Sequence, residues 1–250
     1  MGIGRTLLIF LRSALFFICF CINFLALSAA LSPCLIIRSR AVVGRVAKFW
    51  NWINVRLLRI ICGVKYKVEG AENIPDSPAL ILFRHESTWE TYFLYQYFKI
   101  PPVIIAKKEL LYIPIFGFLL KGAGNILVDR KAGISSIKEL VRQAKRATTN
   151  EKRSILISPQ GTRVPIGGSA EDYPYRSGFC AVMESCDLPL LPVALDSGKA
   201  WPKGSFLKYP CVINVKFLPL IPREITKNMD KDSTVELVKN LIEEERKKMG

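Results

Sequence analysis

Hydrophobic and polar positions follow three different patterns along the chain. In the first, residues 13–37 form a run of 25 residues without a charged side chain, flanked by Arg12 and Arg38. A helix that stops before Pro33 has about 20 residues and a length of roughly 30 Å, which matches the hydrocarbon core of a bilayer. We therefore expect a membrane helix over about residues 13–32. A cleaved signal peptide is the alternative, although its apolar region usually has about 7–15 residues.

In the second pattern, residues 41–61 show a helical period with one basic face. Apolar side chains recur at steps of three and four residues, and no acidic residue interrupts the opposite stripe. The pattern predicts an amphipathic helix that lies in the headgroup layer. The alternative is an ordinary helix that packs on a protein core. The apolar positions are Val42, Val46, Phe49, Trp50, Ile53, Leu57, Ile60 and Ile61, and the opposite stripe holds Arg45, Lys48, Trp52, Arg56 and Arg59.

In the third pattern, short apolar runs alternate with helical stretches at residues 134–147 and 235–248. Such alternation predicts an α/β domain with a mostly parallel central sheet. No linker or repeat interrupts it, so we expect membrane-anchoring helices over residues 1–62 and one domain over residues 63–250. The runs expected to form strands are 64–69, 79–83, 103–106, 126–128, 155–157, 190–195 and 212–217.

Charge is distributed unevenly along the chain. The net charge is +15, and residues 1–68 hold ten basic side chains but no acidic one. The remaining 182 residues carry 26 basic and 21 acidic side chains, a net charge of +5. A basic excess beside an apolar helix indicates a membrane surface and argues against a nucleic-acid partner. Six basic residues from Arg38 to Arg59 outnumber the two before Ser13, so the positive-inside rule places residues 38–250 in the cytoplasm.

The composition limits the chemistry that the chain can perform. His85 is the only histidine, and no C-x-x-C pair is present. These two facts exclude a zinc site that needs two histidines, and they mean that any histidine base must be His85. The seven cysteines are irregularly spaced, which favours a reducing compartment over a disulfide framework.

The segment around His85 follows directly after an apolar run that is expected to be a buried strand. Ser87 and Glu90 match a helix capping box, so one interpretation is that Glu90 only caps a helix. The other is that Glu90 lies beside His85, fixes its tautomer and stabilises its cation, which makes His85 a general base. The local sequence leaves both interpretations open.

Two further segments carry candidate anion-binding residues. In residues 158–163, Gly161 permits an unusual turn and Arg163 suits a phosphate or carboxylate. In residues 124–131, a strand ends at Asp129 and the basic pair that follows it. Each pattern is also compatible with a solvated surface, so neither is decisive alone.

In this order, the segments resemble motifs of the 1-acyl-sn-glycerol-3-phosphate acyltransferase family. His85 followed by Glu90 resembles its catalytic H-x-x-x-x-D motif. Residues 124–130 resemble a second motif that ends in Arg, and residues 159–163 resemble P-E-G-T-R. Residues 191–198 resemble a fourth motif, of the V-P-V type. Four motifs in sequence and at suitable spacing make the resemblance specific. The remaining similar stretches are 107–110 (K-x-E-L) and 113–117 (P-x-x-G), and the resemblance covers about residues 60–220.

The resemblance implies the glycerolipid acyltransferase fold, with helices on a mostly parallel sheet and an N-terminal membrane helix pair. It implies transfer of a fatty acyl group from acyl-CoA or an acyl carrier protein thioester to lysophosphatidic acid, giving phosphatidic acid, with no metal or other cofactor. His85 and Glu90 would be catalytic, and Arg163, Arg130 and Lys108 would bind the phosphate. The expected location is a membrane, the inner one in a bacterium, with the domain on the cytoplasmic side. Supporting motif residues are Gln160, Gly161, Thr162 and Pro192.

Two residues depart from the family pattern. Glu90 replaces the usual Asp, which keeps the charge on a longer side chain, and Gln160 replaces the usual Glu, which loses a charge. Gln160 leaves open an acyltransferase that acts on another lysophospholipid or an aminolipid. A catalytically silent lipid-binding protein is a further alternative. A serine hydrolase is disfavoured because the sequence has no G-x-S-x-G motif.

Overall fold

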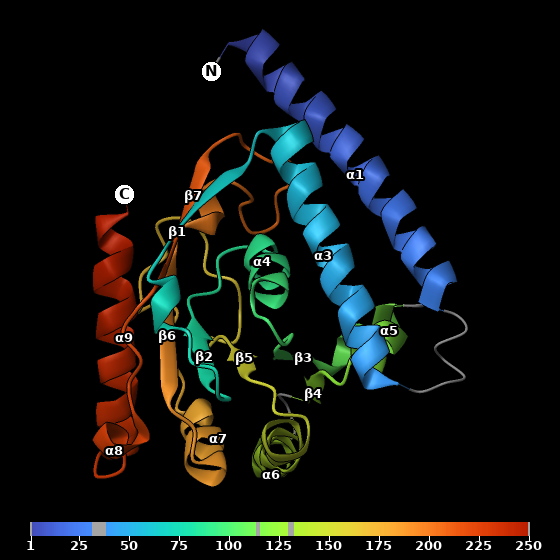
Figure 1. Cartoon of the computed structure of the whole chain (residues 1–250). Helices are drawn as coiled ribbons and strands as arrows, with labels where there is room; N and C mark the ends of the chain where they lie inside the picture. The colour runs from blue at the N-terminus through green and yellow to red at the C-terminus, as the bar shows by residue number, and fades with distance from the viewer. Residues whose placement is uncertain (1, 32–38, 114–115, 130–132, 250) are drawn as a thin grey trace.

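The computed structural model of the chain describes residues 2–31, 39–113, 116–129 and 133–249. Its centre is a seven-stranded sheet in the order β1-β7-β6-β2-β5-β3-β4 (Figure 1). Each of the seven apolar runs forms a strand, as predicted. The strands are β1 (Lys65–Glu69), β2 (Leu80–Phe83), β3 (Val103–Lys107), β4 (Ile126–Val128), β5 (Ile155–Ile157), β6 (Leu190–Leu195) and β7 (Val212–Phe217).

Most of the sheet is parallel, which confirms the predicted fold class. Strands β2, β3, β4, β5 and β6 run in the same direction, whereas β7 pairs antiparallel with β6 and parallel with β1. The carboxyl ends of the five parallel strands therefore meet at one edge of the sheet. Ligand sites in open α/β sheets usually lie at this edge.

Helices cover both faces of the sheet (Figure 1). Alternate residues of β2 point to opposite faces, so Ile81 and Phe83 pack with α3 and α4, while Leu80 and Leu82 pack with α6, α7 and α9. The helices are α1 (Ile3–Leu31), α3 (Arg40–Cys62), α4 (Trp89–Tyr97), α5 (Phe116–Gly122), α6 (Gly133–Lys145), α7 (Gly178–Cys186), α8 (Arg223–Thr226) and α9 (Lys231–Lys248).

Helix α1 lies along α3 at the outside of the molecule (Figure 1). It begins at Ile3, so the predicted start at residue 13 was wrong. The cause is that arginine is a good helix former, and Arg12 does not interrupt the helix. The predicted end near Pro33 lies outside the described residues. Among the described helices, residues 3–29 of α1 are long and apolar enough to cross a membrane, with a mean hydropathy of 2.3.

Helix α3 packs on the core through part of the predicted apolar stripe and through residues outside it. Of the predicted apolar positions, Trp50 is 6% exposed, whereas Phe49 and Ile60 are 60% and 78% exposed. The buried face also includes Asn54 and Leu58, which the predicted stripe did not contain. The difference arises because this helix carries apolar side chains on more than one stripe, and periodicity alone does not choose between them. Helix α3 therefore packs on the domain while its basic residues Arg45, Arg56 and Arg59 stay exposed.

Candidate active site

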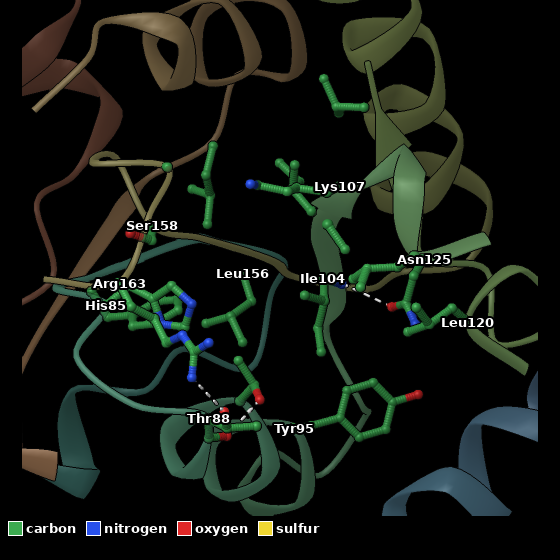
Figure 2. Close-up of a pocket in the computed structure, with 18 of the residues that line it drawn as sticks. His85, Thr88, Tyr95, Ile104, Lys107, Leu120, Asn125, Leu156, Ser158 and Arg163 are labelled. Atoms are coloured by element: carbon green, nitrogen blue, oxygen red, sulfur yellow. Dashed lines mark hydrogen bonds between the residues drawn. The ribbon is translucent and has the colours of Figure 1, made fainter. Parts of the chain in front are cut away.

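A cavity of about 970 Å³ lies at the carboxyl edge of the sheet, beneath the helix pair α1 and α3. Its apolar wall includes Phe24 of α1, Trp50 of α3 and Leu120 of α5. Polar side chains from the ends of β2, β3 and β5 line another part of it (Figure 2). A long apolar chain and a polar headgroup would both find suitable surroundings in this cavity.

His85 and Glu90 meet in the loop between β2 and α4. His85 Nδ1 lies 2.6 Å from Glu90 Oε1. The His85 side chain is 23% exposed, whereas that of Glu90 is completely buried. His85 lines the cavity, so a buried carboxylate lies behind the only histidine of the chain and the cavity lies in front of it. This arrangement orients the imidazole ring.

Glu90 also bonds to the backbone that leads into α4. Its Oε1 accepts hydrogen bonds from the backbone N–H groups of Glu86 and Ser87, each at 2.8 Å. The hydroxyl of Ser197, on the 3₁₀ turn η4 (Ser197–Lys199) after β6, donates to the other oxygen, Oε2. Four groups from two loops therefore fix one carboxylate.

Arg163 belongs to the loop that follows β5. Its guanidinium donates to Thr88 Oγ1 at 3.2 Å, and both residues project into the cavity (Figure 2). Gly161 has φ +67°, a left-handed backbone that favours glycine, and its N–H closes a turn with the carbonyl of Ser158 at 3.1 Å. The Val164 N–H donates to the His85 carbonyl at 2.6 Å, which joins this loop to the His85 loop.

The other predicted phosphate ligands are Lys108 and Arg130. Lys108, in the 3₁₀ turn η2 (Lys108–Tyr112), has a side chain that is 53% exposed, lies 4.0 Å from Asp129, and is not part of the cavity wall. Its neighbour Lys107, the last residue of β3, lines the cavity instead (Figure 2). Arg130 lies outside the described residues.

Gln160 and Pro192 support the site from outside the cavity. Gln160 is 3% exposed, and its side-chain oxygen accepts a hydrogen bond from Ser158 at 3.0 Å. Pro192 is buried within β6, opposite Leu82 of β2. Thr162, like Gly161, lines the cavity. Gln160 is therefore buried behind the loop and is not part of the cavity wall.

The sequence did not reveal several residues that line or support the site. Arg176 and Lys203 contribute to the cavity wall, and Ser197 binds Glu90. Arg176 and Lys203 lie outside the motifs, and Ser197 appeared only as part of the stretch at residues 191–198. Burial raises the pKa of the Tyr92 phenol in the cavity wall, an effect that nearby Arg163 opposes, so Tyr92 is a neutral group at physiological pH. Among the described residues, no group of three or more His, Cys, Asp or Glu side chains is placed to hold a metal ion.

The sequence is similar to those of known acyltransferases. The Acyltransferase family model matches residues 65–196. A 1-acyl-sn-glycerol-3-phosphate acyltransferase of Pseudomonas aeruginosa is 37% identical over 187 residues, which cover 75% of this chain and 69% of that protein. The enzyme of the same name from Limnanthes alba is 31% identical over 181 residues, which cover 71% of this chain and 62% of that protein.

A solved structure has the same fold. The crystal structure of the 1-acyl-sn-glycerophosphate (LPA) acyltransferase PlsC from Thermotoga maritima superimposes with a TM-score of 0.70 at 17% identity, covering 93% of this chain and 95% of that one. The sequence comparisons thus confirm the family resemblance that the motifs indicated, and the superposition confirms the predicted fold. The chain is an acyltransferase and belongs to the 1-acyl-sn-glycerol-3-phosphate acyltransferase family.

Proposed function

We propose that this protein transfers a fatty acyl group from an acyl thioester to the free hydroxyl of lysophosphatidic acid at a membrane surface, which yields phosphatidic acid. The observation that carries the proposal is the 2.6 Å contact between His85 Nδ1 and Glu90 Oε1 at the wall of a large cavity. The same cavity offers the Arg163 guanidinium for a phosphate and apolar side chains for an acyl chain.

His85 is the general base in this proposal. An alcohol is a poor nucleophile near neutral pH, so a base must take its proton as its oxygen attacks the thioester carbonyl. His85 Nδ1 is engaged by Glu90, which leaves Nε2 to accept that proton. The new bond joins the hydroxyl oxygen to the carbonyl carbon, the carbon–sulfur bond breaks, and the proton passes from Nε2 to the leaving thiolate. Base catalysis of this kind contributes roughly 10²–10⁴-fold to the rate.

Cationic side chains in the cavity wall select the phosphate. Arg163 suits two-point recognition of phosphate oxygens, and Lys107 adds a second positive charge. Arg130 keeps the phosphate-binding role proposed from the sequence, whereas the exposed position of Lys108 disfavours such a role. The donor is acyl-CoA or an acyl carrier protein thioester, and no cofactor takes part.

The helix pair α1 and α3 attaches the enzyme to the membrane in this proposal. Neighbouring residues of α1 differ sharply, since Phe16 is 1% exposed and Leu15 is 52% exposed, so an apolar face remains uncovered. On α3, the exposed rings of Phe49 and Trp52 stack at 5.7 Å, and the Arg56 guanidinium lies 4.3 Å from the Trp52 ring centroid. Aromatic rings beside basic residues suit the headgroup layer of the cytoplasmic leaflet.

The membrane attachment is tested by charging the uncovered face. Replacing Leu11 and Leu15 together by Glu is expected to move the protein from the membrane pellet to the soluble fraction after cell lysis, because both side chains are more than half exposed. A matched control replaces Tyr112 and Ile166, which are exposed on the domain, by Glu and is expected to leave the protein in the pellet. Equal distribution of the two double variants would contradict the proposed attachment.

The substrate is tested with a panel of lysolipids. The full-length protein in detergent or vesicles receives acyl-CoA or acyl carrier protein thioesters together with lysophosphatidic acid, an uncharged lysolipid or an amine-bearing lysolipid, and the products are measured by mass spectrometry. Phosphatidic acid is the expected main product. Activity on only the uncharged or amine-bearing acceptors would refute the proposed substrate and favour the alternative that Gln160 suggested, which the position of Gln160 outside the cavity wall does not support.

A further inference from the structure

A cluster of buried charged side chains lies beside the active site but outside the cavity. Arg84 and Glu86 flank His85 in sequence and are 6% and 3% exposed. Arg84 Nε lies 3.1 Å from Glu86 Oε1. Neither residue lines the cavity, so substrate contact does not explain why two charges are buried there.

The partners of both residues come from the C-terminal helix α9. Arg246 Nε donates to Glu86 Oε1 at 2.8 Å, and Glu243 accepts a hydrogen bond from Arg84. The Tyr175 hydroxyl donates to the other oxygen of Glu243 at 2.9 Å. Helix α9 therefore binds the His85 loop through two ion pairs. In each pair, the two partners are more than 150 residues apart in sequence.

Glu86 also connects this cluster to the carboxylate behind His85. Its backbone N–H donates to Glu90 Oε1, and its carboxylate accepts a hydrogen bond from the Gly198 N–H at 3.0 Å. Ser197, the residue before Gly198, donates to Glu90 Oε2. Glu86 thus lies between α9 and the turn η4. Its backbone binds Glu90 directly, and its carboxylate binds the residue next to Ser197.

The energetics of buried ion pairs argue against a purely stabilising role. Apolar side chains of similar size often stabilise a fold as well as a buried ion pair does, because the charges must be stripped of water. Burial raises the pKa of the Glu86 carboxyl, and the Arg246 guanidinium opposes that rise. An ion pair does, however, fix two groups in one geometry, and here one of the groups belongs to the loop that carries the proposed catalytic base.

We propose that Arg246 and Glu243 of helix α9 are positioning residues, which hold residues 84–87 so that Glu90 stays in contact with His85. The inference rests on the proposed role of His85 as the base. It assigns a part in the reaction to the C-terminal helix, which lies beyond the residues that the family model matches.

The first test does not depend on turnover. His85 is the only histidine, so full-length protein labelled with ¹⁵N-histidine gives the imidazole signals of one residue. In the neutral wild-type ring, the ¹⁵N shifts are expected to report the Nδ1–H tautomer that faces Glu90. Arg246→Met should shift the population toward the Nε2–H tautomer. Lys239→Met, which removes an exposed ion pair with Glu236 on the same helix, should leave the spectrum unchanged.

The second test measures kinetics. Arg246→Met should lower kcat roughly tenfold with KM nearly unchanged, because the loss affects the position of the base and not substrate binding. Arg246→Lys should retain most of the activity. The double variant Glu86→Gln with Arg246→Met should recover much of the loss, since an amide at position 86 no longer needs a cation, and it also serves if Arg246→Met alone does not fold.

Two results would overturn the inference. One is a folded Arg246→Met variant with the wild-type ¹⁵N spectrum and wild-type kcat. The other is a double variant as impaired as Arg246→Met in both measurements. Failure of the proposed function can be distinguished from failure of this inference. Even if the protein does not acylate lysophosphatidic acid, the ¹⁵N spectra of the wild type and of Arg246→Met would still show whether Arg246 governs the His85 tautomer.

Discussion

The helix pair and the His85 loop are built in opposite ways. Helix α1 is held mainly by side-chain packing. For example, the ring centroids of Phe20 and Trp50 lie 5.4 Å apart, and Phe16 meets Trp201 edge-on with ring centroids 6.0 Å apart. The His85 loop is held by directed bonds, with His85 and two backbone N–H groups at Glu90 Oε1. Packing tolerates many apolar residues of similar size, whereas directed bonds need a specific atom at each position. Substitutions should therefore affect stability in the first region and rate in the second.

The largest effect is expected for the charge of Glu90. Glu90→Gln keeps the size of the side chain but removes the charge that stabilises the His85 cation, so kcat should fall on the order of 10³-fold with little change in KM. Phosphatidic acid formation measured by mass spectrometry gives both constants. Glu90→Asp, which keeps the charge, is the matched control and should lose much less. Equal losses in the two variants would show that the charge is not what matters.

Two neighbouring residues of α1 test the packing region. Phe16→Ala should lower the free energy of unfolding by about 3–5 kcal/mol, because it leaves a cavity at a position that is 1% exposed. Leu15→Ala, at a position that is 52% exposed, should change it by less than about 0.5 kcal/mol. Denaturant titration in detergent measures both values. A similar loss in the two variants would contradict the one-sided packing of α1.

A smaller effect is expected when one donor to Glu90 is removed. Ser197→Ala takes away the hydroxyl that binds Glu90 Oε2, and a hydrogen bond to a charged group contributes about 1.5–3 kcal/mol, so kcat should fall roughly 10–100-fold. Ser205→Ala is the control, since that hydroxyl bonds to the backbone of Leu207 and not to Glu90. If both variants lose activity equally, general destabilisation explains the result and the positioning role of Ser197 is wrong.

The smallest effect is expected for a conservative change at the phosphate site. Arg163→Lys keeps a positive charge but loses the planar fork, so KM for lysophosphatidic acid should rise about fivefold while kcat changes little. Arg142→Lys on α6, where the arginine is exposed and paired with Glu139, should leave both constants unchanged. A wild-type KM in Arg163→Lys would mean that Arg163 does not bind the phosphate.

Much of the fold was predictable because strands and helices follow from the spacing of apolar residues along the chain. The run at residues 190–195 is apolar throughout, and β6 is buried along its whole length, as expected for an inner strand. Periodicity was less informative for α3, where the predicted positions Phe49 and Ile60 are exposed and Leu58, which lies outside the predicted stripe, is buried. The start of α1 was missed because a charge boundary at Arg12 was taken for a helix boundary.

The candidate site was predictable only where chemistry and order along the chain coincided. His85, Glu90 and Arg163 were singled out by motifs, and the structure brings them to one edge of the sheet. Lys107 was passed over in favour of Lys108, because the motif contains adjacent lysines and only the direction of the strand end decides which one faces the cavity. Contacts between distant segments leave no local signal, so Ser197 beside Glu90 and Arg246 beside Glu86 appear only in the folded chain.

The central claim is that His85 is the base for acyl transfer, and the rate of phosphatidic acid formation by His85→Ala tests it most directly. The imidazole is partly exposed to the cavity, so the substitution should leave the fold intact, as the thermal unfolding midpoint would show. We predict that kcat falls by roughly 10²–10⁴-fold in a variant that still binds lysophosphatidic acid. A folded His85→Ala protein that forms phosphatidic acid at the wild-type rate would contradict the account.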